Sequence, residues 1–206
     1  MISYTNPLKE KLEDHILWNK LLNGESQALK DIYDRHSASL YQYGMRMLHD
    51  EESVKDCLQD VFTKIWMNHS TLNTTSNIRF YLIAALRNNI INFHLLENRY
   101  KKVDILEHEI FDLNFSVENA FIKNEEMHEK AHQRSISMNQ LSARQKEIIY
   151  LRYFEEMDYE QIAHIMDFSV KSAYKLSARA LESLRLIMGL EKSVLIGLLI
   201  TAKHHF

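Results

Sequence analysis

The amino-acid sequence predicts an all-α protein made of two small helical domains. Three observations lead to this fold class. The 206 residues include only four Gly and one Pro, and Pro7 precedes the body of the chain, so strong helix breakers are rare. Apolar residues recur at helical spacing over long stretches. An acidic, weakly periodic segment, residues 103–137, separates two such stretches and is expected to be a linker with little helix.

The first domain is expected to span residues 25–102, after a leader with one short helix at 1–24. That short helix covers 12–22, and Asn23 and Gly24 can end it. Apolar residues at helical spacing then predict the three helices of the domain, at about 25–49, 51–68 and 78–102. The polar segment 69–77 is rich in turn residues and predicts a loop before the last helix.

The second domain is expected at residues 138–190 and reads as a helix-turn-helix. Ser142 and Asp158 each stand three residues before a Gln, which is the spacing of a capping box, and Ser169 offers a third N-cap. Residues 167–169 make a tight turn between a short helix and the helix that follows it. The second of these helices carries basic residues four apart on the face away from its apolar stripe: Lys171, Lys175 and Arg179. This pattern is typical of a protein that reads the DNA major groove. The alternative is an amphipathic hairpin with a solvated face.

Charge is unevenly distributed along the chain, although the net charge is only −3. From Arg79 to Lys102 there are five basic residues against one acidic residue. From Val103 to Glu129 there are eight acidic residues against one Lys. The overall balance therefore conceals local cationic surface, and local charge is what matters for phosphate contacts.

Other features limit the function classes. The single Cys57 excludes an internal disulfide, fits a reducing compartment, and is expected to be a small buried residue. No secretory signal is seen, and the apolar run 194–200 is too short to span a bilayer, so a cytoplasmic protein without membrane insertion is expected. No metal-ligand spacing, phosphate loop or catalytic constellation stands out. We expect a non-enzymatic protein without cofactor or metal. Its tail, 191–206, is expected to cover the core of the second domain; the alternative is that it offers an apolar surface to an inhibitor protein.

Several strings in both domains match the pattern of one protein family. In the first domain they are Leu40–Tyr43 (LYQY), Asp56–Trp66 (DCLQDVFTKIW) and Phe80–Asn88 (FYLIAALRN). In the second domain they are Leu141–Gln145 (LSARQ) and Tyr159–Ala163 (YEQIA). In this order and at this distance, they resemble regions 2 and 4 of the extracytoplasmic-function sigma factors, a class of the sigma-70 family of bacterial transcription initiation factors. The resemblance implies a region 2-like helical bundle and a region 4-like helix-turn-helix joined by the acidic linker.

The resemblance also implies residue roles. Binding to the β′ clamp helices of RNA polymerase core falls to polar residues of one helix: Asp56, Gln59, Asp60 and Lys64. Melting of the promoter −10 element, with capture of a flipped base, falls to the loop and the long helix: Asn73, Ser76, Asn77, Arg79, Arg87, Asn88, Asn92, Arg99, Tyr100, Lys101 and Lys102. Reading of the −35 element falls to the recognition helix: Lys171, Ser172, Tyr174, Lys175 and Arg179. Ser177 is expected at the margin of the last set.

The function implied is a sigma factor that binds RNA polymerase core through the β′ clamp helices and the β flap, and directs initiation at specific promoters. An anti-sigma factor is the expected regulator. Two departures from the family pattern stand in the second domain: Asp167 replaces a common Gly in the turn, and the acidic loop 155–158 would weaken nearby phosphate contacts. The alternatives are a conventional helix-turn-helix regulator with a ligand-sensing or dimerising first domain, and a protein-interaction module.

Overall fold

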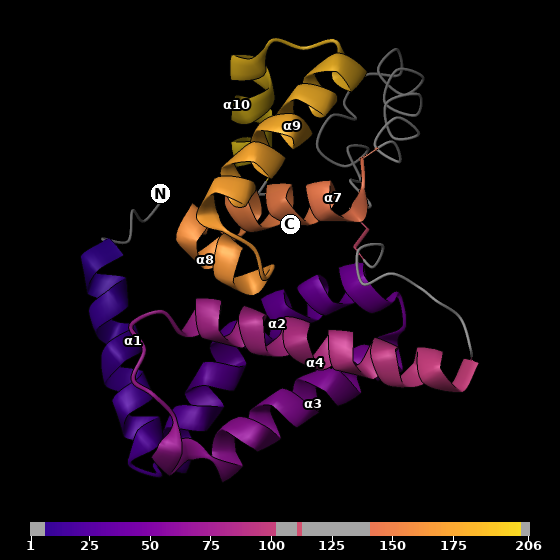
Figure 1. Ribbon diagram of the computed structural model, residues 1–206. Coiled ribbons are helices and arrows are strands. Elements are labelled where there is room, and N and C mark those ends of the chain that lie inside the picture. The colour runs from indigo at the N-terminus through magenta and orange to yellow at the C-terminus, as the bar shows by residue number, and fades with distance from the viewer. Residues whose placement is uncertain (1–6, 102–110, 113–140, 203–206) are drawn as a thin grey trace, which may run out of the picture. The chain divides into compact units, whose positions relative to one another are not determined.

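The computed structural model describes residues 7–101, 111–112 and 141–202, and it contains no strand within these ranges. The all-α prediction is therefore confirmed for the described chain (Figure 1). The chain divides into two compact units, Met1–Asp104 and Ile105–Phe206. Each unit has its own core and is described by itself.

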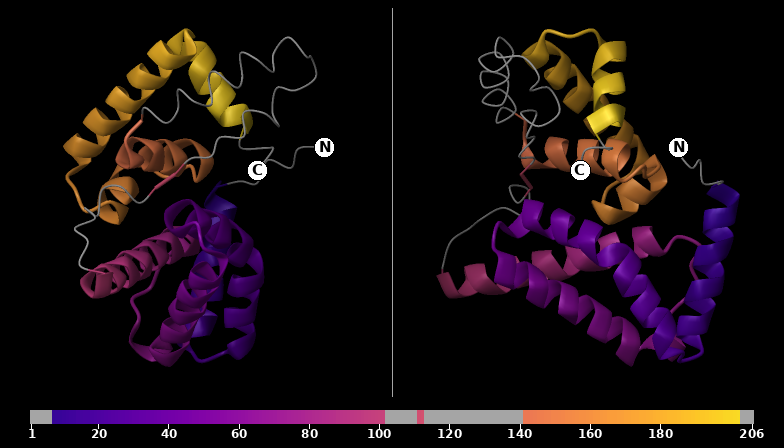
Figure 2. Two further views of the ribbon diagram at one scale, coloured as in Figure 1. Left: turned by 90° about the vertical axis from the view of Figure 1, so that its right-hand side faces the viewer. Right: turned by 180° about the vertical axis from the view of Figure 1, so that it is seen from behind.

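The first unit is a helical bundle (Figures 1 and 2). Its elements are α1 (Pro7–Leu22), α2 (Ser26–Leu48), α3 (Glu51–Met67), the single 3₁₀ turn η1 (His69–Thr71) and α4 (Ile78–Lys101). Helices α2, α3 and α4 pack against one another in pairs, and α1 lies across one end of them. Their facing sides bury the apolar stripes that the sequence predicts, including Ile32, Leu40, Val54, Val61, Ile65, Leu82, Leu86 and Ile90.

The ends of these helices follow from local chemistry. Gly24, with φ 81°, lies just beyond the end of α1, where its lack of a Cβ makes the left-handed conformation inexpensive. The Asp50 carboxylate accepts a hydrogen bond from the Ser53 N–H at 2.9 Å and caps α3. The Asn77 Oδ1 accepts one from the Phe80 N–H at 2.9 Å and caps α4.

Helix α1 is longer and more deeply packed than a leader helix would be. It begins at Pro7, the usual kind of residue for a first helical turn, and both Trp18 and Leu21 are fully buried. The first unit therefore includes α1 in its core, whereas the sequence pattern places the start of the domain at residue 25.

The second unit contains α7 (Ala143–Ile149), the π-helical turn η2 (Tyr150–Phe154), α8 (Tyr159–Ile165), α9 (Val170–Met188) and α10 (Lys192–Ala202). Both predicted capping boxes are present, at Ser142 and at Asp158, and Ser169 caps α9. The turn before α9 also behaves as expected, because Asp167 adopts a left-handed conformation with φ 53°. The π-helical turn was not predicted; it buries Tyr150, Leu151 and Phe154.

Two segments beside the helix-turn-helix pack onto it. The tail forms α10, whose Leu195 and Leu199 are buried where it contacts α9 and η2. Phe111 is also buried, with its ring centroid 5.7 Å from that of Tyr150, and Asp112 pairs with Lys146. At these two positions the expected linker is part of the second unit. The remainder of 103–137 lies outside the described residues.

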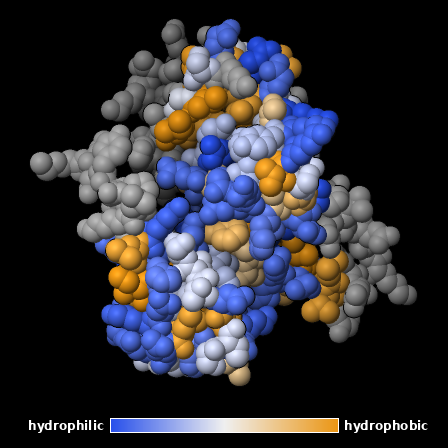
Figure 3. All heavy atoms as spheres, turned by 60° about the vertical axis from the view of Figure 1, so that its left-hand side comes forward, coloured by the Kyte–Doolittle hydropathy of each residue, from blue (hydrophilic) through white to orange (hydrophobic). Residues whose placement is uncertain are grey.

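Hydrophobic residues on the surface form separate patches among polar ones on the face drawn in Figure 3. Exposed large apolar side chains in the described ranges include Leu12 and Ile16 on α1 and Leu186 on α9. No helix in the described part of the chain has the length and apolar character required to cross a membrane.

Candidate functional site

The second unit presents one exposed polar face on α9. All five residues predicted for −35 recognition are exposed on this helix: Lys171, Ser172, Tyr174, Lys175 and Arg179. The opposite side of the helix is buried and includes Ala173, Ala180 and Leu184. Three cationic side chains therefore share a solvent-facing stripe on a helix that is firmly packed from behind, as a groove-reading helix requires.

The start of α9 is fixed by its cap. The Ser169 Oγ accepts a hydrogen bond from the Ser172 N–H at 3.2 Å and lies 2.9 Å from the Ser172 Oγ. The Ser172 hydroxyl is thus held next to the first turn, where a recognition helix makes its base contacts.

An aromatic pair joins α8 to α9. The ring centroids of Tyr159 and Tyr174 lie 3.9 Å apart, and the Arg152 guanidinium carbon lies 5.1 Å from the Tyr159 ring centroid. The Tyr159 hydroxyl is 3.0 Å from the Ser177 Oγ. Ser177 is only 1% exposed, so its expected place at the margin of the DNA-reading surface is wrong; it faces the core because it bonds Tyr159.

The acidic loop before α8 is less acidic at its surface than its sequence suggests. Glu155 is buried at 6% exposure, and Asp158 uses its carboxylate to cap α8 by accepting the Gln161 N–H at 2.8 Å. The loop is also held by Arg152, whose Nη1 donates to the Met157 carbonyl at 2.8 Å. Glu156 and Asp158 are the carboxylates of this loop that remain exposed.

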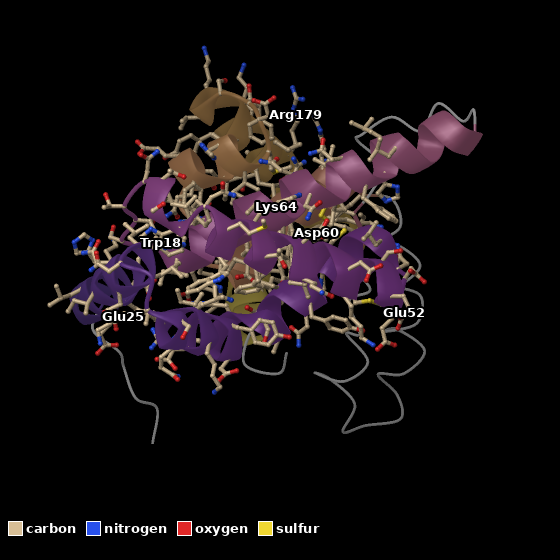
Figure 4. The ribbon with its side chains drawn as sticks, turned by 90° about the horizontal axis from the view of Figure 1, so that it is seen from below. Trp18, Glu25, Glu52, Asp60, Lys64 and Arg179 are labelled. Carbon is tan, nitrogen blue, oxygen red and sulfur yellow. The ribbon has the colours of Figure 1, made fainter. Side chains whose placement is uncertain are left out.

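In the first unit, α3 carries a polar face opposite its buried stripe. Asp56, Gln59, Asp60 and Lys64 are all exposed, whereas Cys57, Val61 and Ile65 point into the core. Figure 4 shows Asp60 and Lys64 on neighbouring turns of this helix. The arrangement brings together the four residues predicted to bind polymerase, as one continuous strip along α3.

An apolar groove of about 780 Å³ runs beside that strip, between α2 and α3. Its walls include Leu29, Tyr33, Leu58, Phe62 and Trp66, and Gln59 and Thr63 border it. Tyr33 is 48% exposed and meets the Phe62 ring edge-on, at 5.0 Å between centroids. The exposure of Tyr33, together with the groove, is decided by the way α2 packs on α3.

A second hollow, of about 460 Å³, lies between the end of α3, the loop and α4. Four Asn side chains line it: Asn68, Asn88, Asn89 and Asn92. The lining also includes the Lys64 ammonium, the Tyr81 phenol, and Thr71 and Leu72 from the loop. The Asn89 Nδ2 donates to the Cys57 carbonyl at 3.2 Å, which fixes that side chain in the wall. Lys64 thus belongs to this hollow as well as to the α3 strip.

Asn88 and Asn92, which are predicted to contact phosphates or nearby bases, line this hollow together with Asn68 and Asn89, which the sequence pattern does not single out. A signal for Asn89 existed in the sequence, because Asn89 lies three residues before Asn92 and residues three apart are neighbours on a helix surface. Asn68 could not be found in this way, because it belongs to the end of another helix, and only the packing of α3 on α4 brings it there.

The other residues predicted for the −10 element have different surroundings. Asn73 and Ser76 are exposed in the loop, and Arg79 is half-buried. Arg87 is only 6% exposed on the inner face of α4, so its expected contact with DNA phosphates stays a prediction that would need the side chain to become accessible. The side chains of Arg99, Tyr100 and Lys101, at the end of α4, and Lys102 as a whole lie outside the described residues.

Asn77, the predicted base contact at the end of the loop, has a structural role. Its Oδ1 is engaged in capping α4, and its backbone N–H donates to the Thr75 Oγ1 at 3.1 Å. The side chain is half-buried. A residue held in this way shapes the end of the loop, and its carboxamide oxygen is already used by the helix.

A helical bundle followed by a helix-turn-helix unit defines a class of two-unit DNA-binding proteins, and comparison with known proteins narrows it. Residues 32–100 match the family model described as "Sigma-70 region 2", and residues 137–184 match "Sigma-70, region 4". Together the two matches span more than half of the chain. They cover the bundle helices α2 to α4 and the helix-turn-helix, in the order that the sequence strings indicate.

Curated relatives extend this similarity over most of the chain. RNA polymerase sigma factor YlaC of Bacillus subtilis is 23% identical over 154 residues, which cover 74% of this chain and 87% of that protein. ECF RNA polymerase sigma factor SigM of the same organism is 24% identical over 163 residues, covering 76% and 93%.

Solved structures share the fold. CnrH, in complex with the cytosolic domain of CnrY, has a TM-score of 0.56 at 18% identity, over 85% of this chain and 97% of that one. The sigma factor RpoE from Bartonella quintana, in complex with the anti-sigma factor NepR, has a TM-score of 0.55 at 19% identity, over 79% and 97%.

The chain belongs to the sigma-70 family, and within it to the extracytoplasmic-function sigma factors. Its function is that of a promoter-recognising sigma factor.

Proposed function

We propose that the two units divide the work of promoter recognition, with α9 reading the −35 element. The observation that carries this proposal is the exposed stripe of α9 on a buried, capped helix. Lys171 and Ser172, in the first turn, are positioned for base edges. Lys175 and Arg179 lie further along and neutralise phosphates, which favours association and makes it depend on salt.

The first unit binds RNA polymerase core through α3. The strip formed by Asp56, Gln59, Asp60 and Lys64 offers charge and hydrogen bonds, and the neighbouring groove offers apolar surface. An interface needs an apolar centre with a polar rim, and the groove with its bordering strip supplies both for a helical partner. We assign this surface to the β′ clamp helices, and the second unit to the β flap, following the family.

The amide-rich hollow accepts one base of the −10 element after it leaves the duplex. Asn88 and Asn92 supply donors and acceptors for a base edge, and Tyr81 supplies an aromatic wall. Asn68 and Asn89, whose Nδ2 atoms donate to the Lys64 and Cys57 carbonyls, add their carboxamide oxygens as acceptors. A flipped base has lost its pairing partner and must regain hydrogen bonds and stacking in the pocket that holds it. The hollow is therefore a better candidate for base capture than the Asn77 side chain.

The remaining parts of the proposal follow from the same function. RNA synthesis belongs to the polymerase, so the chain itself is not an enzyme. Its site of action is the cytoplasm, where polymerase and promoter DNA are found. The regulator is an anti-sigma factor, because structural neighbours at 18% and 19% identity were solved in complexes, one of them with the anti-sigma factor NepR.

Run-off transcription with purified bacterial core polymerase tests the proposal. The templates are pooled genomic promoter fragments from the host of this protein, and each reaction is run with and without the protein. We expect defined new transcripts that Asp60→Ala and Lys175→Ala abolish or strongly reduce. Lys20→Ala, which removes an exposed cation of α1 outside both proposed surfaces, is the matched control and should leave the transcripts in place.

Binding assays separate the two defects. Asp60→Ala should weaken binding to core polymerase and leave DNA binding by the second unit intact, whereas Lys175→Ala should do the reverse. Tight, specific DNA binding by the protein alone, without any affinity for core polymerase, would instead support the conventional helix-turn-helix regulator.

A further inference from the structure

The loop between α3 and α4 is fastened at two points by α1, a helix that lies outside the family-model match. The first point is the Asn73 carbonyl. It accepts a hydrogen bond from the Trp18 Nε1–H at 2.9 Å, across 55 positions of sequence. Trp18, which is labelled in Figure 4, is fully buried, so its Nε1–H has no access to water.

The second point is the end of the loop. The Ile78 N–H, the first of α4, donates to the Asp14 Oδ2 at 2.9 Å in a buried site. The other oxygen of Asp14 is 3.4 Å from the Arg35 Nη1. A carboxylate at a helix N-terminus satisfies an amide that has no partner within the helix, and here that carboxylate comes from a different helix.

These two anchors lie beside the amide-rich hollow. Thr71 and Leu72 line it from the loop and directly precede the anchored Asn73. Tyr81 lines it from α4, and its ring centroid is 4.8 Å from that of Trp18. Trp18 therefore contacts one lining residue, Tyr81, directly, and also holds Asn73, the residue that follows the lining residue Leu72. Fixing such walls in advance removes the ordering cost that a mobile loop would carry into binding.

We propose that Trp18 and Asp14 are positioning residues that hold the hollow in the shape needed to select one base of the opened promoter strand. This inference rests on the proposed base-capture function of the hollow. The two residues hold the loop through the Asn73 carbonyl and the Ile78 amide. Their loss should therefore change both the order of the loop and the ability of the hollow to discriminate between bases.

Two kinds of substitution test it. Trp18→Phe keeps an aromatic ring against Tyr81 and removes the N–H donor. Asp14→Ala removes the acceptor for Ile78, whereas Asp14→Asn keeps an oxygen that can accept the same hydrogen bond and should rescue. Leu40→Ala removes a side chain that is 1% exposed in α2 and serves as the control for loss of stability in the same unit.

The probe is a pool of short single-stranded DNA of randomised sequence, bound to holoenzyme assembled from the full chain and core polymerase. Sequencing of the bound DNA gives the base preference at each position, and titration gives the affinity for core polymerase. For Trp18→Phe and Asp14→Ala we expect discrimination at one position to fall by on the order of tenfold, with core affinity unchanged. Asp14→Asn and Leu40→Ala should retain the wild-type preference.

The outcomes distinguish the positioning role of Trp18 and Asp14 from the proposed base capture in the hollow. If the wild-type holoenzyme selects a base and Trp18→Phe and Asp14→Ala select it equally well, the positioning role is overturned and base capture stands. If all variants, Leu40→Ala included, lose selectivity in proportion to their stability, the role is merely structural and the proposal is also overturned. If the wild-type holoenzyme has no base preference, base capture in the hollow fails and the positioning role fails with it.

Discussion

The Lys146 Nζ lies 2.7 Å from the Asp112 Oδ1, so a residue of the segment expected as linker is paired with the first helix of the second unit. Lys146 is 8% exposed, so the Asp112 carboxylate stands in for much of the water that its ammonium group has lost. Breaking a buried pair by neutralising one side leaves the other charge in a poor environment.

From this pair we predict that Asp112→Asn lowers the free energy of unfolding of the second unit by about 1–3 kcal/mol. Urea denaturation followed by far-ultraviolet circular dichroism measures the change in both units. Both Trp residues, Trp18 and Trp66, belong to the first unit, so Trp fluorescence isolates that unit and should be unaffected. Glu182→Gln, which breaks an exposed pair with Arg185, is the control and should cost less than about 1 kcal/mol; equal losses would contradict the prediction.

Gly44 lies inside α2 where that helix approaches α3. A Cβ at this position would lie 2.8 Å from the Val54 Cγ1, and Val54 is fully buried. In an open helix, Gly→Ala stabilises by about 1 kcal/mol, but here the clash decides the sign. We predict that Gly44→Ala destabilises the first unit by about 1–3 kcal/mol in urea titrations followed by Trp fluorescence.

The double variant Gly44→Ala/Val54→Ala provides the check on this mechanism. With the Val54 methyl groups removed, the new Cβ has room, so Gly44→Ala should cost less in the Val54→Ala background than in wild type. The same cost in both backgrounds would mean that the close approach to Val54 is not the reason.

Stability should fall in mild acid because of His36. Burial lowers the pKa of this His from 6.5 to about 4; Asp14 opposes the shift, and Arg35 and Arg79 add to it. Below pH 6.5 His36 becomes protonated in the unfolded chain, whereas in the folded protein it stays neutral down to about pH 4. The unfolded state therefore binds more protons in this window, and stability is lost as the pH falls through it. We predict a loss on the order of 2 kcal/mol between pH 7 and pH 4 from this group.

Urea titrations of the first unit at several pH values measure that loss, and His36→Gln supplies the comparison. The variant has no proton to take up at this position, so its stability should decline less between pH 7 and pH 4. Parallel curves for wild type and variant would assign acid sensitivity to other groups.

Cys57 should be a poor nucleophile in the folded protein. Burial, and after it the carboxylates of Asp60 and Asp56, raise the pKa of its thiol from 9.0 to about 11. Because the thiolate is the reacting form, alkylation by iodoacetamide at pH 8 should be roughly 100-fold slower than for an ordinary thiol. Mass spectrometry of the timed reaction checks this, with the urea-unfolded chain as the fast reference; equal rates would show that the thiol is accessible and activated.

On the recognition helix, α9, the salt dependence of DNA affinity should distinguish residues that contact phosphates from residues that contact bases. We predict that Arg179→Ala weakens binding to all DNA sequences alike and reduces the slope of log K against log salt by about 1. Lys171→Ala, at the start of the helix, should instead relax the preference for one base pair. Fluorescence anisotropy with holoenzyme on selected and scrambled −35 duplexes measures both, and a uniform loss for Lys171→Ala would reassign it to the phosphates.

Much of the fold could be predicted because its signals are local. The caps at Ser142, Asp158 and Ser169 each involve residues within one turn, and all three are found where the sequence pattern predicts them. The left-handed turn at Asp167 is of the same kind. Exposure of the cations on α9 follows equally from helical periodicity, because one stripe of the helix is apolar and the other must face water.

The helical pattern was least informative where it indicates only that a residue is polar. Arg87 and Ser177 are polar and yet buried, the second because the Tyr159 hydroxyl from another helix reaches it. Asn77 carries a carboxamide of the kind that can contact a base, but the oxygen of this carboxamide caps α4. Contacts of this kind depend on how the helices pack against one another. The residue pattern of a single helix carries no information about that packing.

The sequence by itself determined the helical class, the order of the two units, the capped starts of α7, α8 and α9 and the cationic stripe of α9, because each depends on residues within a few positions of one another. Only the tertiary structure decided that α1 fastens the loop through Trp18 and Asn73, that Asn68 joins Asn92 around one hollow, and that Asp112 belongs with Lys146. The physical reason is that these contacts join separate helices, and side chains distant in sequence meet only after the apolar stripes have packed.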